Sequence, residues 1–250
     1  MTLLHKEIFV CLDIEATGLD PLQERIIEIA AAKFDFSQII KSFDTLVDPQ
    51  IAIPDVSKAI HNISQDMVMG KPKIYEVLPE VLKFLDGHIL VGHGILFDIQ
   101  IIINEAKRYS IPNNIHNIKY IDTLRLARLY GESPFNSLKE LSKHFNIEFE
   151  GAHRALNDVL ANIEIFKKLA HTFTTSAQIL KRLEKPIAIK AMPFGKHKGR
   201  PFSQIPIDYL KWAAGKEFDQ DLLYSIRLEI NNRKKKNPSF EQASNPFASL

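Results

Sequence analysis

Cysteine and long apolar segments are what this sequence of 250 residues most clearly lacks. Its one cysteine, Cys11, cannot form an intramolecular disulfide, so we expect a buried core residue and a reducing, cytoplasmic setting. No apolar run approaches the ~18 residues that a membrane-spanning helix needs, and the N-terminal residues show no signal-peptide pattern. We therefore expect a cytoplasmic protein without a membrane partner.

A strong excess of one charge is also absent, because 32 basic residues stand against 30 acidic ones. The charges are nevertheless distributed unevenly, since residues 186–236 contain eleven Lys or Arg and five Asp or Glu. A basic C-terminal region after a mildly acidic body suggests contact with a polyanion. An ordinary solvated surface is the alternative that the sequence leaves open.

What the sequence does contain is the composition and patterning of a globular α/β protein, with 45% apolar and 25% charged residues. Apolar and β-branched residues predict strands at 8–14, 25–34, 39–47, 89–92 and 118–121. Asp35 and Ser37 supply a tight turn between the second and third strands, so we expect the first three to form an antiparallel meander.

Helices are predicted between and after these strands, where apolar residues recur every three or four positions. The predicted ranges are 79–85, opened by Pro79, then 97–109, 123–130, 137–145 and 155–170. The last helix has an apolar stripe formed by Leu156, Val159, Leu160, Ile163 and Phe166. Strands followed by strand–helix alternation predict a mixed α/β domain over residues 1–172.

The remaining chain is expected to form a connector at 173–190, a small α+β domain at 191–232 and a disordered tail at 233–250. In the small domain, two short strands should surround a basic turn. Helices should follow at 205–214 and 219–232, and we expect Tyr209 and Trp212 in the core.

Two carboxylates, Asp13 and Glu15, lie at the end of the first predicted strand. Residues two apart point to the same face of a strand, so the two carboxylates repel each other unless a cation neutralises them. Carboxylate oxygens are ligands that suit Mg²⁺ or Mn²⁺. A solvent-facing strand end with two ordinary acids is the alternative.

Asp98, His153 and Asp158 are further candidates, near the starts of predicted helices. Asp98 follows a glycine-containing turn, where it either binds a metal or complements a helix dipole. His153 and Asp158 would lie about 140° apart on one helix, so a helix that begins just after His153 suits both residues better. A loop histidine with a pKa near ~6.5 suits a general base, although a surface histidine is the simpler interpretation.

In combination, these segments resemble the DEDDh family of exonucleases, which includes the proofreading ε subunit of bacterial DNA polymerase III. The matching strings are DIEATGLD at 13–20, LVGHGILFD at 90–98 and HRALND at 153–158, with shorter similarities at 60–64, 121–124 and 137–141. They occur in family order and at family-like separations. The resemblance covers roughly residues 7–171.

The resemblance implies a ribonuclease-H-like fold, with a mixed five-stranded sheet flanked by helices. It implies that Asp13, Glu15, Asp98 and Asp158 bind two divalent cations, Mg²⁺ or Mn²⁺, and that His153 is the general base. These five residues are therefore the expected catalytic set.

Family members also cradle the 3′ nucleotide with residues that follow the first motif. The corresponding residues here are Ala16, Thr17, Gly18 and Leu19, with His61 as a further candidate. Two more positions are informative: Arg154 replaces the tyrosine of the related tyrosine subclass, and Gly94 replaces an Asn that is usual in the family. The glycine removes any contact that the Asn side chain makes, but leaves the implied metal ligands in place.

The implied function is metal-dependent removal of nucleoside 5′-monophosphates from single-stranded or frayed DNA 3′ ends, in replication proofreading or repair. An RNA-trimming 3′→5′ exoribonuclease is one alternative, because no residue here predicts a contact with the 2′-OH. A non-catalytic nucleic-acid-binding module that kept the fold is another alternative, although the presence of all five expected catalytic residues counts against it.

The C-terminal region resembles a small bacterial domain of uncertain function that follows exonuclease domains. Lys196, Lys198 and Arg200, beside His197, are expected to grip substrate phosphates, but they suit a solvated turn equally well. The string lacks the Gly-Lys-Ser/Thr ending of a P-loop. The tail residues 240–250 are a candidate peptide for contact with a polymerase or sliding clamp, and a stand-alone enzyme is the alternative.

Overall fold

The computed structural model describes residues 2–130, 135–148 and 154–236. These residues divide into two compact units. The first unit comprises the described residues of 1–127 and 136–183. The second comprises those of 128–135 and of the chain from Glu184 on.

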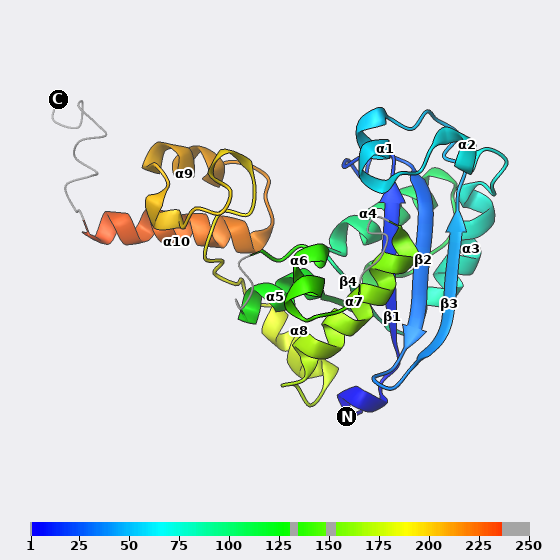
Figure 1. Ribbon diagram of the computed structural model, residues 1–250, viewed down its shortest axis with the longest axis horizontal. Coiled ribbons are helices and arrows are strands. Elements are labelled where there is room, and N and C mark those ends of the chain that lie inside the picture. The colour runs from blue at the N-terminus through cyan, green and yellow to red at the C-terminus, as the bar shows by residue number, and fades with distance from the viewer. Residues whose placement is uncertain (1, 131–134, 149–153, 237–250) are drawn as a thin grey trace. The chain divides into compact units, whose positions relative to one another are not determined.

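A five-stranded mixed sheet, in the order β3-β2-β1-β4-β5, forms the centre of the first unit. The strands are β1 (Phe9–Ala16), β2 (Ile26–Phe34), β3 (Ile39–Leu46), β4 (Ile89–Gly92) and β5 (Tyr120–Asp122). β1, β2 and β3 form the predicted antiparallel meander (Figure 1). β4 runs parallel to β1, and β5 runs parallel to β4. The predicted mixed sheet is therefore confirmed.

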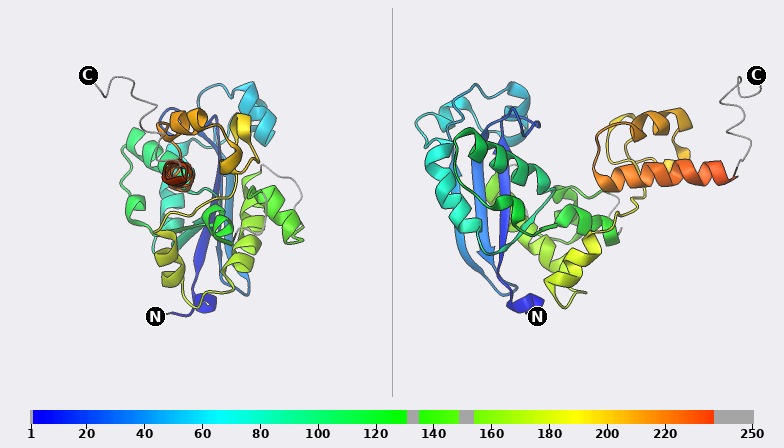
Figure 2. Two further views of the ribbon diagram at one scale, coloured as in Figure 1. Left: turned by 90° about the vertical axis from the view of Figure 1, so that its left-hand side faces the viewer. Right: turned by 180° about the vertical axis from the view of Figure 1, so that it is seen from behind.

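Helices cover both faces of this sheet (Figures 1 and 2). The helices described up to Leu183 are α1 (Asp55–His61), α2 (Gln65–Val68), α3 (Ile74–Leu85), α4 (Leu96–Arg108), α5 (Thr123–Tyr130), α6 (Leu138–His144), α7 (Ala155–Ala170) and α8 (Ser176–Leu183), with short 3₁₀ turns η1 (Leu4–Lys6) and η2 (Ile115–Asn117). The last residues of α5 belong to the second unit. None of these helices, nor any other in the described chain, is long and apolar enough to cross a bilayer.

The two faces of β1 pack against different helices, which explains the unbroken apolar run at residues 9–12. Val10, Leu12 and Ile14 share a buried cluster with residues of α3 and α4. On the opposite face, the rings of Phe9 and Phe166 of α7 have centroids 5.2 Å apart. Asp13 and Glu15 belong to this second face, because side chains alternate along a strand.

Helix α3 begins earlier than predicted, at Ile74, and it contains Pro79 instead of starting there. The buried residues Ile74, Val77 and Val81 explain the difference, since they form one apolar stripe against the sheet. The amide of Lys73 donates a hydrogen bond to Oε2 of Glu76 (2.7 Å), which satisfies a backbone group at the start of the helix. Pro79 lies on the exposed face of the helix, so the backbone hydrogen bond that proline cannot donate is missing on the solvent side.

The buried face of α7 also differs from the predicted stripe. Leu160 is 38% exposed, whereas the polar residues Asp158 and Asn162 are buried. Asn162 is held by polar partners, because its Oδ1 accepts a hydrogen bond from the hydroxyl of Thr123 (2.6 Å). The side-chain amide of Asn162 also contacts Sγ of Cys11, which is fully buried as predicted.

The segment expected to be a connector, 173–190, contains helix α8. Its Ile179 and Leu183 are buried, and the carbonyl of Leu183 accepts a hydrogen bond from Nη1 of Arg125 (2.5 Å) in the same unit. The first unit therefore extends to Leu183, beyond the predicted end at residue 172. Burial of the apolar side of a short amphipathic helix provides the physical reason.

The second unit is helical, which corrects the predicted α+β assignment. It contains η3 (Gly195–His197), η4 (Phe202–Gln204), α9 (Ile207–Ala214) and α10 (Gln220–Lys236). Instead of two strands, the basic turn is closed by a single bridge between Ala191 and Pro201, because proline cannot donate to a strand ladder. Met192, Phe202, Leu210, Leu222 and Ile226 are among the buried residues of its core.

Two further expectations for this unit need correction. Helix α10 continues to Lys236, so the first residues of the expected tail are helical, while 237–250 lie outside the described residues. Trp212, expected in the core, is 54% exposed, because Leu210 and Ala213 provide the buried face of α9. The guanidinium of Arg128 ties the end of α5 to this unit, through hydrogen bonds to Asp219 (2.7 Å) and Asp221 (3.2 Å).

Candidate active site

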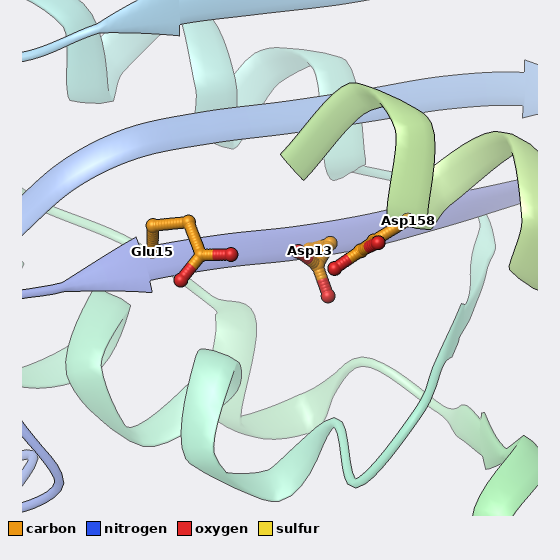
Figure 3. A group of neighbouring side chains, drawn as sticks. All are labelled: Asp13, Glu15 and Asp158. Carbon is orange, nitrogen blue, oxygen red and sulfur yellow. The ribbon is translucent and has the colours of Figure 1, made fainter. Parts of the chain in front are cut away.

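Three carboxylates from two elements meet on one face of the sheet (Figure 3). Asp13 and Glu15 project from β1, and Asp158 projects from the first turn of α7. One ligand oxygen from each residue lies within 4.8 Å of the others. Residues that are more than 140 positions apart in the sequence are therefore brought together by the packing of α7 on β1.

The negative charges of this cluster repel one another. Burial raises the pKa of Asp13 well above its usual range, and the negative charges of Asp98, Asp158, Glu15 and Glu28 raise it further. Burial also raises the pKa of Glu15 to about 8, with contributions from Asp158 and Glu28, although Arg154 lowers it. Carboxylates that are paired with positive charge have lowered pKa values instead. The raised pKa values of Asp13 and Glu15 therefore mean that a bound cation would stabilise the ionised cluster.

Asp98 lies beside this cluster, in the first turn of α4, and is 6% exposed. Burial raises its pKa well above the usual range, while hydrogen bonds from the backbone amides of Asp98 and Ile14 lower it. Its charge is close enough to raise the pKa of Asp13, yet its oxygens are not part of the three-carboxylate group. The structure thus places Asp98 at the margin of the cluster.

The donor set fits a hard divalent cation. It consists only of carboxylate oxygens, which suit Mg²⁺ or Mn²⁺ and not a soft metal. Like charges at this distance under partial burial are costly unless a cation neutralises them. The residues present therefore fit a divalent metal ion, and the chemistry of the ligands does not select between Mg²⁺ and Mn²⁺.

A partly buried ion pair, which the sequence did not predict, fixes the start of α7. Glu28 of β2, 4% exposed, accepts hydrogen bonds from Nη2 of Arg154 (2.7 Å) and from the amide of Ala155 (2.9 Å). The same carboxylate thus binds the guanidinium and satisfies an amide at the N-terminus of α7. Asp158 follows one turn later, so Glu28 and Arg154 set the position of a cluster carboxylate. Glu28 could have been suspected from sequence, because it is the only acidic residue in the strand Ile26–Phe34.

His153 lies outside the described residues. What the structure does describe is the start of α7 at Ala155, so the helix begins after His153, as the angular argument required. The role of His153 stays a prediction from the sequence.

The segment after β1 is fixed by its own side chains. Thr17 is buried. Its hydroxyl donates a hydrogen bond to Oε2 of Glu24 (2.5 Å) and accepts one from the amide of Arg25 (2.9 Å), so the hydroxyl already has partners within the chain. A side chain at Gly18 would collide with Glu24, since a Cβ there would lie 2.5 Å from Oε1. Leu19, in contrast, is 86% exposed.

Helix α1 packs beside this segment, and His61 is its last residue. The hydroxyl of Ser57 donates to the carbonyl of Thr17 (2.6 Å). His61 is 2% exposed, and its Nδ1 accepts a hydrogen bond from the amide of Ile63 (3.0 Å). Its ring is therefore oriented by the backbone at the end of α1, and little of the ring is open to solvent.

Gly94 has φ = +73°, and its amide donates to Oδ1 of Asp122 (2.9 Å). Asn is one of the few other residues that tolerate this left-handed backbone. The glycine therefore preserves the path of the chain into α4, and only the side-chain contacts of an Asn are missing.

The remaining candidates, Lys196, Lys198 and Arg200, are exposed and belong to the second unit. Lys196 lies in η3, and Lys198 and Arg200 follow it, on a turn in which Gly195 and Gly199 both have positive φ values. The structure thus groups these three cations on one turn of that unit.

Two family models match the chain. Residues 10–166 match a family described as "Exonuclease", which spans more than half of the sequence. Residues 179–229 match a family described as "Putative quorum-sensing-regulated virulence factor". The first match includes the segments that supply the carboxylate cluster, and the second falls mainly on the second unit.

Curated relatives include proteins named DNA polymerase III subunit epsilon. That of Aquifex aeolicus is 38% identical over 183 residues, which is 71% of this chain and 90% of the relative. That of Treponema pallidum is 33% identical over 190 residues, or 73% of this chain and 86% of the relative. A PolC-type DNA polymerase III of Caldanaerobacter subterraneus is 38% identical over 164 residues, but only 11% of its length is matched.

Solved structures show the same fold. Exonuclease X in complex with 5′ overhanging duplex DNA has a TM-score of 0.56 and 26% identity, over 69% of this chain and 98% of that one. The nuclease domain of 3′hExo, a DEDDh family member bound to rAMP, has a TM-score of 0.58, over 67% of this chain and 94% of that one. At 18% identity, the second likeness shows the fold alone.

Proposed function

This chain belongs to the exonuclease family that matches residues 10–166 and is a DEDDh 3′→5′ exonuclease, a phosphodiesterase; from this we propose that it trims DNA 3′ ends in replication proofreading or repair. The products would be nucleoside 5′-monophosphates. The observation that carries the proposal is the meeting of Asp13, Glu15 and Asp158 within one group of ligand oxygens. DNA as substrate is supported by the relatives, two of which carry the name of a DNA polymerase subunit.

We propose that Asp13, Glu15, Asp98 and Asp158 hold two divalent cations. When bound, such a pair stabilises charge on the attacking and leaving oxygens of an in-line phosphoryl displacement and lowers the pKa of water. Three of the four proposed ligands form the cluster, and Asp98 adjoins it.

The chain's own residues would then divide the remaining work. His153 would accept the proton of the attacking water, for which a pKa near neutrality is suited. Glu28 and Arg154 would position Asp158 through the start of α7. Leu19, exposed just beyond β1, would contact the terminal base or sugar.

The test is degradation of matched single-stranded DNA and RNA oligonucleotides that carry a label at the 5′ end. A ladder that shortens from the 3′ end of DNA, with RNA left intact and with full loss of activity in excess EDTA, is the expected result. Preferential shortening of RNA would replace DNA by RNA as the substrate. Undiminished activity in EDTA would remove the metal sites from the proposal.

A further inference from the structure

A row of rings lies on the second unit, formed by His197, Tyr209 and Trp212. The ring centroids of His197 and Tyr209 are 4.5 Å apart, and those of Tyr209 and Trp212 are 5.2 Å apart. Nζ of Lys216 lies 5.1 Å from the centroid of the Trp212 ring. The row therefore runs from the basic turn, along α9, to a lysine just beyond the end of the helix.

Exposure increases along this row. His197 is 6% exposed and Tyr209 is half-buried, whereas Trp212 is 54% exposed. Tyr209 anchors the row, because it packs against the core of the unit. The row thus has a fixed base and an open indole at its outer end.

The rings lie among positive charges. Residues 190–216 contain six Lys or Arg and a single acidic residue, Asp208. Lys196 and Lys198 are exposed on the turn that holds His197. The hydroxyl of Tyr209 lies against the same turn, because a Cβ at Gly195 would be 3.4 Å from it. The basic turn therefore lies against the buried end of the aromatic row, and the exposed residues of the two make up one candidate surface.

This combination matches the chemistry of single-stranded nucleic acid. Unpaired bases stack on aromatic side chains at about 1–3 kcal/mol per base, and phosphates are neutralised by nearby Lys and Arg. A duplex hides the faces of its bases, so an exposed indole favours an unpaired strand. Cores of protein–protein interfaces are depleted in Lys, which makes a protein partner a poorer match for this surface.

We propose that the second unit binds single-stranded nucleic acid on this surface, with a base stacked on Trp212 and with phosphates held by Lys196, Lys198 and Lys216. The residues of this site belong to the second unit, whereas those of the carboxylate cluster belong to the first. The proposal goes beyond the exonuclease function, because this binding needs neither a metal nor a 3′ end. Binding here would hold a strand without cutting it.

The fluorescence of Trp212 provides a direct test, because it is the only tryptophan in the chain. The full chain is titrated in EDTA with an oligothymidylate of about 15 nucleotides, a length within the range of known single-strand sites. Saturable quenching is expected, with weaker quenching by a blunt duplex. An oligouridylate in parallel tells whether the site accepts RNA. No response to any single strand, or an equal response to duplex, overturns the proposal.

Two variants test the rings by polarisation of a labelled oligonucleotide. Trp212→Ala is expected to weaken binding about 5- to 150-fold, as the loss of one stacked base predicts, while Trp212→Phe should retain most of the affinity. Tyr224→Ala is the matched control, because Tyr224 is 41% exposed but lies on α10 outside the row. Equal affinity of Trp212→Ala and Tyr224→Ala overturns stacking.

The cations are tested by salt dependence, read from the fluorescence of Trp212. The double variant Lys196→Ala/Lys198→Ala should lower the slope of log K against log salt by about 1.4, at roughly 0.7 per phosphate contact on a single strand. Lys181→Ala/Arg182→Ala, on the exposed side of α8 in the first unit, is the control and should leave the slope unchanged. An unchanged slope in the first variant overturns the proposal, as does a fluorescence shift caused by protein concentration alone, which would indicate pairing of two copies.

Discussion

At the scale of single residues, burial and like charges raise the pKa values of two carboxylates of the cluster, Asp13 and Glu15. Asp13 and Glu15 are held at least partly out of water beside like charges. Their ionised forms are disfavoured in the absence of a cation, so metal binding must compete with protons. The cost of ionisation appears as a pH dependence of stability.

The sign of that dependence follows from Glu15. Its pKa is about 8 in the folded chain, against ~4.3 in an unfolded one. Between these values the folded state holds a proton that the unfolded state has lost, so the free energy of unfolding falls as pH rises. In EDTA, Glu15→Gln should be more stable than the wild type at about pH 8.5, and this advantage should shrink towards about pH 5. Urea unfolding at both pH values measures the difference.

Addition of Mg²⁺ is the control for that measurement. The ion should restore stability to the wild type at high pH and should act less strongly on Glu15→Gln, which lacks one ligand charge. Parallel pH profiles of the two proteins in EDTA would show that the Glu15 carboxylate is ionised at no cost, against the raised pKa.

His153 is the second test at the residue scale. His153→Ala should lower kcat about 10²- to 10⁴-fold, the usual contribution of a general base, without a change in melting temperature. His171→Ala, at an exposed histidine at the end of α7, should retain wild-type kcat. Wild-type turnover by His153→Ala would transfer the role of general base to another group.

At the scale of elements, the position of α7 decides the geometry of the cluster, and Glu28 holds its first turn. Glu28→Gln weakens the pair with Arg154 and the bond to the amide of Ala155. A loss of about 1–3 kcal/mol of unfolding free energy is expected, below the value for a fully buried pair because Arg154 is half exposed. Because such supporting residues typically act by 10- to 100-fold, a similar loss of activity is expected.

Rescue by metal separates positioning from simple destabilisation. If Glu28 acts through Asp158, excess Mn²⁺ should recover part of the activity of Glu28→Gln, while its melting temperature stays low in the metal-free state. Glu164→Gln, on the exposed side of α7, should match the wild type in both measurements. Unchanged activity in Glu28→Gln would leave Glu28 with a purely structural role.

Aromatic packing attaches the other end of α7 to the sheet. The ring of Phe166 is fully buried and lies 5.2 Å from that of Phe9 and 5.9 Å from that of Phe34. Phe166→Ala should cost about 3–5 kcal/mol in chemical denaturation, as is usual for the loss of a buried aromatic ring. Leu160→Ala, on the partly exposed face of the same helix, should cost far less. Equal costs would mean that this helix end does not carry the packing energy.

At the scale of the whole molecule, two units with different charge are joined in one chain. The cluster of the first unit is anionic, whereas the surface of the second around Trp212 is cationic. A tether converts binding by the second unit into a higher effective concentration of substrate for the first. The KM of the exonuclease should therefore depend on the length of the substrate strand.

This gives a kinetic prediction that follows from both proposals. Trp212→Ala should raise KM about 5- to 100-fold on an oligonucleotide of roughly 30 residues, with kcat unchanged, because it removes binding and not chemistry. On a trinucleotide the variant and the wild type should agree, and Tyr224→Ala should behave as wild type on both substrates. A KM increase of equal size on both substrates would place Trp212 in the cleavage site itself.

The sequence by itself determined the α/β class, the meander of β1 to β3, the limits of α5 and α7, and the family. These features depend on local information, since apolar alternation, helical spacing and short motifs are legible within a few residues. The same information predicted that α7 begins after His153, because a helix cannot turn residues five apart towards one site.

Tertiary structure decided the rest, because burial depends on neighbours that are distant in sequence. Leu160 and Trp212 have apolar side chains at plausible core positions, yet the packing partners of α7 and α9 leave both exposed. Glu28 is charged within an apolar strand, and only the arrival of Arg154 and the start of α7 makes its burial tolerable. The fold likewise gathers Asp13, Glu15 and Asp158 into one group, since a sequence gives the order of charges but not the distances between them.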